Sequence, residues 1–274
     1  MSPHTVPAAA ATRKPLALIT GASAGIGYEL ALCFAQNGHD LVIVARRAES
    51  LQRLAEELKA KYDCTAHVCV ADLSHPSAPA EIHAFTSNKN IIVDVLVNNA
   101  GFGANGAFQA LDLKTQMEMI QVNITALVEL THRYLPQLVQ YARAGTGVMN
   151  IASTAAFIPG PFMAVYYATK AFVLSFSAAL SNEMRGTGVT VCCVCPGATT
   201  TEFQERANLS KSKLFNGRVM TAGTVAREAY AGYAAGQSVV VTGMVNKMAA
   251  FSSRFVPRAV AADLARSLQG PQKP

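Results

Sequence analysis

A short apolar run at Leu16–Thr20 leads directly into three glycines, and a segment with helical periodicity follows them. The glycines Gly21, Gly25 and Gly27 have the spacing G-x-x-x-G-x-G, and residues 28–37 place apolar side chains on one helix face. The pattern predicts a strand, a tight glycine turn and a helix. Backbone N–H groups are unpaired at a helix N-terminus, and the helix dipole favours negative charge there. The turn therefore suits a phosphate or pyrophosphate.

The same stretch also matches G-x-S-x-G, the nucleophile turn of serine hydrolases, with Ser23 as the attacking residue. In that fold the catalytic histidine follows the nucleophile and the acid along the chain. Here the last histidine is His132, and the second half of the chain has none. The missing base disfavours a hydrolase.

The 274 residues are 51% hydrophobic, which is enough for one large α/β domain. Residues 1–15 are rich in Ala and Pro and lack the apolar core of a secretory signal, so we expect a disordered tail and a cytoplasmic protein. The six cysteines show no spacing typical of a zinc site or a disulfide framework. We expect reduced thiols and no metal.

The formal net charge of +6 is concentrated at the two ends of the chain. Arg13 and Lys14 give residues 1–15 a charge of +2, and residues 244–274 carry five basic residues against Asp263, or +4. Residues 16–243 therefore sum to zero, which disfavours nucleic-acid binding by the folded core.

Apolar runs that resemble strands alternate with helical patterns across residues 16–243. We expect strands at 16–20, 40–45, 65–70, 92–97, 147–151, 189–194 and 238–242. This alternation predicts a single α/β domain with a doubly wound parallel sheet, a Rossmann fold of about seven strands covered by helices on both faces.

Polar or glycine residues follow six of these runs, where each expected strand ends. They are Thr20-Gly21, Arg46-Arg47, Asp72-Leu73, Asn98 to Gly101, Ser153 and Pro196-Gly197. The carboxyl ends of parallel strands meet at one edge of the sheet, and ligands bind there. The six loops therefore predict one shared site.

The residues after the second expected strand indicate which dinucleotide binds. A site for NAD usually has an acid about 20 residues beyond the glycines, which holds the ribose 2′-OH. Here Ala45 occupies that place and Arg46 and Arg47 follow. Two guanidinium groups suit a 2′-phosphate, so the sequence favours NADP(H) over NAD(H).

Tyr166 and Lys170 are four residues apart in an expected helix at 165–185, so they share one face of it. Ser153 ends the strand before that helix. An ammonium group beside a phenol favours the phenolate, and bringing a tyrosine pKa from ~10 to ~7 requires about 4 kcal/mol. A partly desolvated lysine plus a cationic nicotinamide could supply that, and the tyrosine would then be a proton donor and acceptor near neutral pH. Tyr167 adjoins Tyr166 but lacks the four-residue offset.

Taken together, these motifs resemble the short-chain dehydrogenase/reductase family, in its single-domain branch of about 250 residues. The resemblance covers residues 16–243 and rests on Thr20-Gly-x-x-x-Gly-x-Gly27, Asp72, Asn98-Asn-Ala-Gly101, Asn123, Ser153, Tyr166-x-x-x-Lys170 and Pro196-Gly197.

The resemblance implies a role for each of four catalytic residues. Tyr166 would be the general acid for reduction and the base for oxidation. Lys170 would lower the pKa of Tyr166 and hold the nicotinamide ribose. Ser153 would hydrogen-bond the substrate oxygen, and Asn123 would help to hold a water in a proton relay. Besides Arg46 and Arg47, the implied cofactor residues are Gly21, Ser23, Ala24, Gly25, Ile26, Gly27, Asp72, Leu73, Asn99, Ala100, Gly101, Tyr166, Lys170, Pro196, Gly197, Thr199 and Thr201.

Residues 198–221 form a polar segment that carries lysines, and we interpret it as a mobile lid over the substrate. Apolar walls near Ser153 and Tyr166 would come from Phe102, Phe157, Ile158, Phe162, Met163 and the lid residue Phe203. These walls favour an apolar carbonyl or secondary alcohol, although ordinary loop packing would give the same composition.

The last segment, 244–274, is a basic amphipathic extension. Met244, Met248, Phe251 and Phe255 recur at helical spacing, with basic residues nearby. Such a face most often packs on its own domain or on another subunit, and the alternative is peripheral contact with a membrane surface.

These observations favour an NADP(H)-dependent oxidoreductase that interconverts a carbonyl and a secondary alcohol. The family resemblance implies a homodimer or homotetramer formed through the helices that carry Asn123 and Tyr166. The alternative is an NADP(H)-binding sensor or scaffold without turnover, which would not need all four catalytic residues. Epimerases and dehydratases of the same fold are longer and usually have another glycine spacing.

Overall fold

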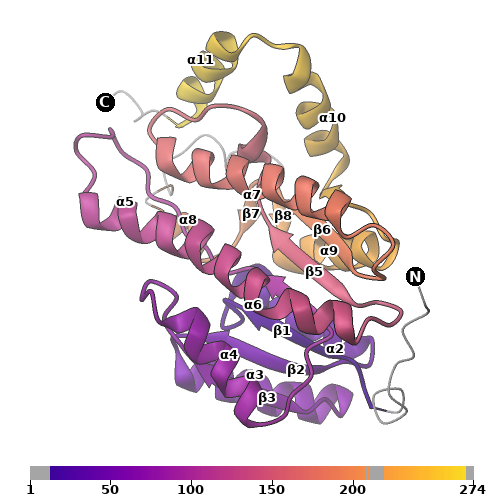
Figure 1. Cartoon of the computed structure of the whole chain (residues 1–274). Coiled ribbons are helices and arrows are strands. Elements are labelled where there is room, and N and C mark those ends of the chain that lie inside the picture. Colours follow the sequence, from indigo (N-terminus) through magenta and orange to yellow (C-terminus); the bar gives the residue numbers. More distant parts are fainter. Residues whose placement is uncertain (1–12, 208, 210–218, 270–274) are drawn as a thin grey trace.

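The computed structural model describes residues 13–207, 209 and 219–269. Its centre is a seven-stranded sheet in the order β3-β2-β1-β4-β5-β6-β9, and every neighbouring pair is parallel (Figure 1). The strands are β1 (Leu16–Thr20), β2 (Asp40–Ala45), β3 (Ala66–Val70), β4 (Val95–Asn98), β5 (Gly147–Ile151), β6 (Thr190–Cys195) and β9 (Val239–Val241). The expected doubly wound parallel sheet is confirmed.

Helices cover both faces of this sheet (Figure 1). The larger ones are α2 (Gly25–Gln36), α3 (Ala48–Tyr62), α4 (Ala78–Asn88), α5 (Leu113–Ile120), α6 (Ala126–Gln140), α7 (Ala164–Glu183) and α9 (Ala222–Ala234). One buried cluster joins α2, α3 and α9 to the sheet, and a second joins α4, α6 and α7 to its other face.

Strand β1 shows why these sequences form central strands. Successive side chains of a strand point to opposite faces, and both faces are covered here. Ala17 and Ile19 belong to the first cluster, and Leu16 and Leu18 to the second. A continuous apolar run is therefore required, because an alternating one would bury polar groups on one face.

The chain is ordered upstream of β1. The Arg13 Nη1 lies 2.6 Å from the Asp94 Oδ2, and the Arg143 Nε lies 2.9 Å from the Asp94 Oδ1. Leu16 N also donates to the buried Asp94 carboxylate. The expected disordered tail over 1–15 is therefore wrong for its last three residues, because this carboxylate holds them. Residues 1–12 lie outside the described part of the chain.

Between α5 and α6 the helix continues through a π-helical turn, η1 (Gln121–Thr125), which carries Asn123. A short 3₁₀ turn, η2 (Thr154–Phe157), follows β5. Single π turns inside α-helices redirect the side chains they carry. Thus η1 sets the direction of the Asn123 side chain, which the sequence did not reveal.

The expected lid, 198–221, is described only at its two ends. Strands β7 (Thr199–Thr200) and β8 (Met220–Thr221) pair in parallel, and α8 (Phe203–Arg206) follows β7. Residues 208 and 210–218 lie outside the description, so the lid remains a prediction there.

The C-terminal extension consists of α10 (Met244–Ser252), the 3₁₀ turn η4 (Ser253–Phe255) and α11 (Arg258–Gln269). Helix α10 leads away from the sheet and α11 returns toward α7 (Figure 1). Its large apolar residues are mostly exposed, with Met244 at 71% and Phe255 at 74%. Packing of this stripe on its own domain, one of the expected arrangements, is therefore wrong, because α10 faces the domain with Asn246 and Ala250 rather than with the large apolar residues.

All six cysteines are buried and free, in line with their expected place in the core. Within the described ranges, each helix is too short or too polar to cross a lipid bilayer.

Candidate active site

A cavity of about 440 Å³ opens at the carboxyl ends of the strands, as the polar loops predicted. One end, here called the glycine end, is formed by Gly21, Gly25, Gly27 and Asn99. The other, the aromatic end, is formed by Phe102, Met163, Tyr167, Phe203 and Leu209. Of the expected cofactor residues, all line this cavity except Arg47: they are Gly21, Ser23, Ala24, Gly25, Ile26, Gly27, Arg46, Asp72, Leu73, Asn99, Ala100, Gly101, Tyr166, Lys170, Pro196, Gly197, Thr199 and Thr201.

The glycine end requires glycine for two separate reasons. Gly21 and Gly25 have φ values of +67° and +58°, which side chains rarely tolerate. A Cβ on Gly27 would lie 2.3 Å from the Gly21 carbonyl oxygen, closer than any real contact. Helix α2 begins in this turn without a side-chain cap, so its first N–H groups face the cavity's edge unpaired.

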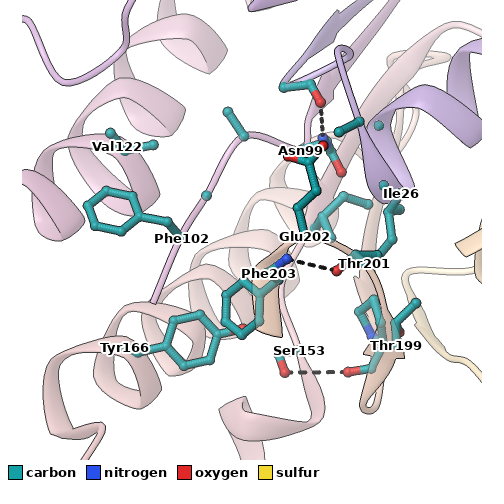
Figure 2. A pocket seen from close by; sticks show the side chains of 18 of the residues that line it. Ile26, Asn99, Phe102, Val122, Ser153, Tyr166, Thr199, Thr201, Glu202 and Phe203 are labelled. Atoms are coloured by element: carbon teal, nitrogen blue, oxygen red, sulfur yellow. Dashed lines mark hydrogen bonds between the residues drawn. The ribbon is translucent and has the colours of Figure 1, made fainter. Parts of the chain in front are cut away.

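Asn99 joins the ends of β1 and β4, where the order of the strands reverses. Its Nδ2 donates to Thr20 O at 2.8 Å, and its backbone N donates to the Thr20 Oγ1 at 3.0 Å. Figure 2 shows Asn99 opposite Ile26, with Thr201 and Glu202 from the β7–α8 segment nearby. This reversal point is where open parallel sheets bind their ligands.

The two arginines after β2 have different partners. Arg46 lines the cavity, and its Nη1 lies 3.7 Å from the Asp72 Oδ2. Arg47 lies at the rim, where it donates to the Ser23 Oγ and, at 3.2 Å, to the Glu202 Oε1. The structure thus places Arg46 in the cavity, whereas Arg47 binds Glu202 of the expected lid segment, 198–221.

Ser153, Tyr166 and Lys170 face the same cavity, Ser153 from the loop after β5 and the other two from α7. The Lys170 Nζ is buried, donates to Ile151 O at 2.9 Å and lies 5.8 Å from the centre of the Tyr166 ring. The Ser153 Oγ accepts from Ala155 N at 3.1 Å, which fixes the hydroxyl at the start of η2. The three side chains can therefore meet one small ligand.

Burial dominates the proton equilibria of Tyr166 and Lys170 in the protein alone. Burial raises the pKa of Tyr166 to about 12, against a smaller opposing effect of its hydrogen bond with Ser153. Burial lowers the pKa of Lys170 to about 8. The ammonium contacts the Ile151 carbonyl rather than the phenol, so it does not bring the tyrosine near neutrality here. At neutral pH the phenol is a proton donor.

Asn123 does not line the cavity. Its Oδ1 accepts from Phe102 N at 3.1 Å, and its Nδ2 donates to Phe102 O at 3.0 Å. A Cβ on Gly101 would lie 3.1 Å from the Asn123 Oδ1 and 3.3 Å from the Lys170 Nζ. Asn123 therefore fixes the backbone of the cavity wall and lies beside Lys170 across Gly101.

Of the expected substrate walls, Phe102, Met163 and Phe203 line the cavity, and Figure 2 shows the rings of Tyr166 and Phe203 side by side. Their centroids are 5.3 Å apart. Phe157 and Phe162 do not line it. Phe157 packs into a core cluster with Val173, since η2 turns it away. Phe162 has φ of +65° and lines a smaller neighbouring cavity.

Sequence reasoning missed several lining residues, namely Glu118, Val122, Tyr167 and Glu202. Tyr167 is buried, and its hydroxyl hydrogen-bonds the Gln269 side chain. Its position beside Tyr166 was visible in the sequence, but its partner lies 102 residues away. No local pattern signals such a contact.

A doubly wound parallel sheet with a glycine-lined cavity at its reversal point, and a tyrosine and lysine inside it, defines a nicotinamide-dependent oxidoreductase. Comparisons with known proteins agree. The family model for short chain dehydrogenases matches residues 15–212. Sulfoacetaldehyde reductase 2 of Chromohalobacter salexigens is 39% identical over 189 residues, 69% of this chain and 74% of that protein.

Two solved structures extend the similarity over nearly the whole chain. A short-chain dehydrogenase from Sphingobium yanoikuyae in complex with NADPH has a TM-score of 0.77 and 32% identity, covering 95% of this chain and 98% of that one. The bulky-bulky ketone specific alcohol dehydrogenase from Comamonas testosteroni has a TM-score of 0.74 and 30% identity, covering 92% and 99%. The chain belongs to the short-chain dehydrogenase/reductase family and is an NAD(P)-dependent oxidoreductase.

Proposed function

We propose that this protein is an NADP(H)-dependent enzyme that interconverts a bulky apolar ketone and its secondary alcohol. The observation that carries the proposal is the meeting of Ser153, Tyr166 and Lys170 in a cavity whose far wall is aromatic. These three residues also argue against a nucleotide-binding sensor without turnover, because such a sensor does not require an enclosed proton donor.

The cavity fits the cofactor. The open N-terminus of α2 suits the pyrophosphate, and Gly27 leaves the backbone close enough to reach it. Asp72 and Leu73 would flank the adenine, and Pro196 to Thr201 the nicotinamide side. When bound, the cofactor supplies or accepts the hydride.

The protein supplies the proton. In reduction, the Tyr166 phenol donates its proton to the carbonyl oxygen, and the Ser153 hydroxyl hydrogen-bonds the same oxygen. A pKa of about 12 keeps the phenol protonated at neutral pH, as an acid requires. Lys170, with Asn123 across Gly101, would return the proton through water.

The character of the aromatic end favours an uncharged substrate. Among the described lining residues the only cations are Arg46, near the expected adenosine, and Lys170. An anionic substrate, such as the one named for the Chromohalobacter reductase, would find no cation at the aromatic end among them. A bulky ketone, as named for the Comamonas enzyme, would instead contact Phe102, Met163 and Phe203.

Arg46 and Arg47 support the NADP(H) preference, because both lie after β2 and no carboxylate occupies position 45. We expect titration by fluorescence to show NADPH binding at least about tenfold tighter than NADH. Arg46→Ala should reduce that ratio, since it removes a charge-assisted contact from the cavity, and Arg47→Ala should reduce it less, because Arg47 lies at the rim. Equal affinities would reject the preference.

The activity is tested with a panel of bulky and small ketones and NADPH, using Tyr166→Phe as the control. Removing the general acid should lower kcat by about 10²–10⁴-fold and leave NADPH affinity within about threefold. Cofactor binding without turnover of any ketone would support the sensor.

We also propose a homodimer through α5–α6 and α7, where Met117 and Phe172 are exposed, and size-exclusion chromatography with light scattering tests it.

A further inference from the structure

The end of α11 lies against the aromatic end of the cavity. Gln269 is 2% exposed, and its Nε2 donates to the Tyr167 hydroxyl. Its backbone carbonyl accepts from the Asn105 Nδ2 at 3.4 Å. One turn earlier, the Arg266 guanidinium lies 5.3 Å from the centre of the Phe162 ring. The last turn of the extension thus touches three separate parts of the domain.

Of those parts, Tyr167 lines the substrate space, and Phe162 lines a neighbouring cavity that shares Met163 and Tyr166 with it. The Tyr167 ring lines the cavity and is packed so closely on Gly160 that a Cβ there would lie 2.3 Å away. Asn105 N donates to Ala207 O at 3.1 Å, which connects it to the lid segment after α8. Phe162 occupies a left-handed conformation that costs free energy and needs support from its surroundings.

We propose that α11 is a latch that closes the aromatic end, in which Gln269 and Arg266 are positioning residues. They hold Tyr167 and Phe162, and through them the wall that limits the size of the substrate. This inference rests on the proposed function, because it assigns the latch to the ketone-binding end of that same site.

The remainder of α11 explains why these contacts matter. Apart from its small buried residues Ala261 and Ala265, the helix exposes Val260 and Leu264, at 55% and 60%. With so little apolar surface buried, the helix depends on its last turn for its position. Loss of one contact there should loosen the wall without unfolding the domain.

The kinetic test compares Gln269→Leu with Ser267→Ala, an exposed position on the same helix. Leucine keeps the size of the side chain and removes the hydrogen bond to Tyr167. We expect KM for a bulky ketone to rise about fivefold, with kcat and NADPH affinity within about twofold and KM for a small ketone unchanged. Arg266→Ala should also raise KM for the bulky ketone. Arg266→Lys should keep KM close to the wild-type value, because lysine keeps a cation over the Phe162 ring.

Hydrogen–deuterium exchange of the cofactor-free protein gives a readout that does not need turnover. Residues 158–167 should exchange faster in Gln269→Leu than in wild type, and at the wild-type rate in Ser267→Ala. Unchanged exchange in Gln269→Leu overturns the latch, whatever the enzyme reduces. If wild type reduces no ketone but exchange responds as expected, the latch stands as the closure of this cavity and the ketone proposal fails.

Discussion

The glycine end and the aromatic end of the cavity are made of different parts of the chain. Around Gly21, Gly27 and Asn99 the wall is mostly backbone, fixed by φ values, by close approach and by the bonds from Asn99 to Thr20. At the other end it consists of side chains that come from α7, the lid segment and the loop after β4. A backbone wall admits few residue types, whereas a side-chain wall can change with one substitution.

That difference separates binding from selectivity. The glycine end can hold only what fits a fixed backbone, such as a pyrophosphate on a helix N-terminus. The aromatic end can be reshaped while the proton donor stays in place. We therefore expect substitutions at the glycine end to affect cofactor binding, and those at the aromatic end to affect substrate choice.

The largest effect should come from Gly27→Ala. Its Cβ would overlap the Gly21 carbonyl, so the turn must move, and we expect NADPH to bind at least about 1,000-fold more weakly by fluorescence titration. The control is Gly38→Ala, where φ is +81° but a Cβ meets no atom within 4 Å. Tight NADPH binding by Gly27→Ala would show that the glycine end is not the pyrophosphate site.

Lys170 lies between the two ends, and its burial should be measurable as stability. Its pKa falls from 10.5 to about 8 on folding, so below pH 8 the folded state holds a buried charge at a cost of about 3 kcal/mol. Between pH 8 and 10.5 the unfolded chain binds more protons, and stability therefore rises with pH. In urea unfolding, the free energy of unfolding of the wild type should rise by about 3 kcal/mol relative to that of Lys170→Met as the pH increases over that range. A constant difference would mean that the ammonium is not desolvated.

Substitutions at Phe203 and Phe157 distinguish a residue of the cavity wall from a residue of the core. Phe203→Ala should raise KM for a bulky ketone about fivefold, with the free energy of unfolding changed by less than about 1 kcal/mol. Phe157→Ala should lower the free energy of unfolding by about 2 kcal/mol, because it packs with Val173, and leave KM unaltered. The reverse outcome would place the substrate on the η2 side.

The smallest effect should come from the exposed stripe of α10. Met248 is 67% exposed, so Met248→Ser should change the free energy of unfolding by less than about 0.5 kcal/mol. The control is Met119→Ser on α5, where the side chain is 1% exposed and the loss should be several kcal/mol. A lower oligomeric mass for Met248→Ser would instead assign the stripe to a subunit interface.

The difference between the glycine end and the aromatic end also explains which parts of the site could be predicted from the sequence. The strands and the glycine turn were predictable because apolar runs and glycine spacing are local signals. The places of Phe157 and Phe162 were not, since they depend on the direction of a 3₁₀ turn and on a left-handed residue. The raised pKa of Tyr166 was not predictable either, because it depends on how deeply the fold buries the phenol.

The order of the strands has a consequence for synthesis on the ribosome. Strands β1, β2 and β3 emerge first and pair side by side, but β1 exposes one edge until β4 arrives, more than 50 residues after β2 begins. The pocket needs Pro196 and Gly197 as well, which follow β6. A dinucleotide therefore cannot stabilise the nascent chain until about 70% of it has been made. Through that interval an apolar, half-paired sheet is open to wrong partners before any ligand can stabilise it.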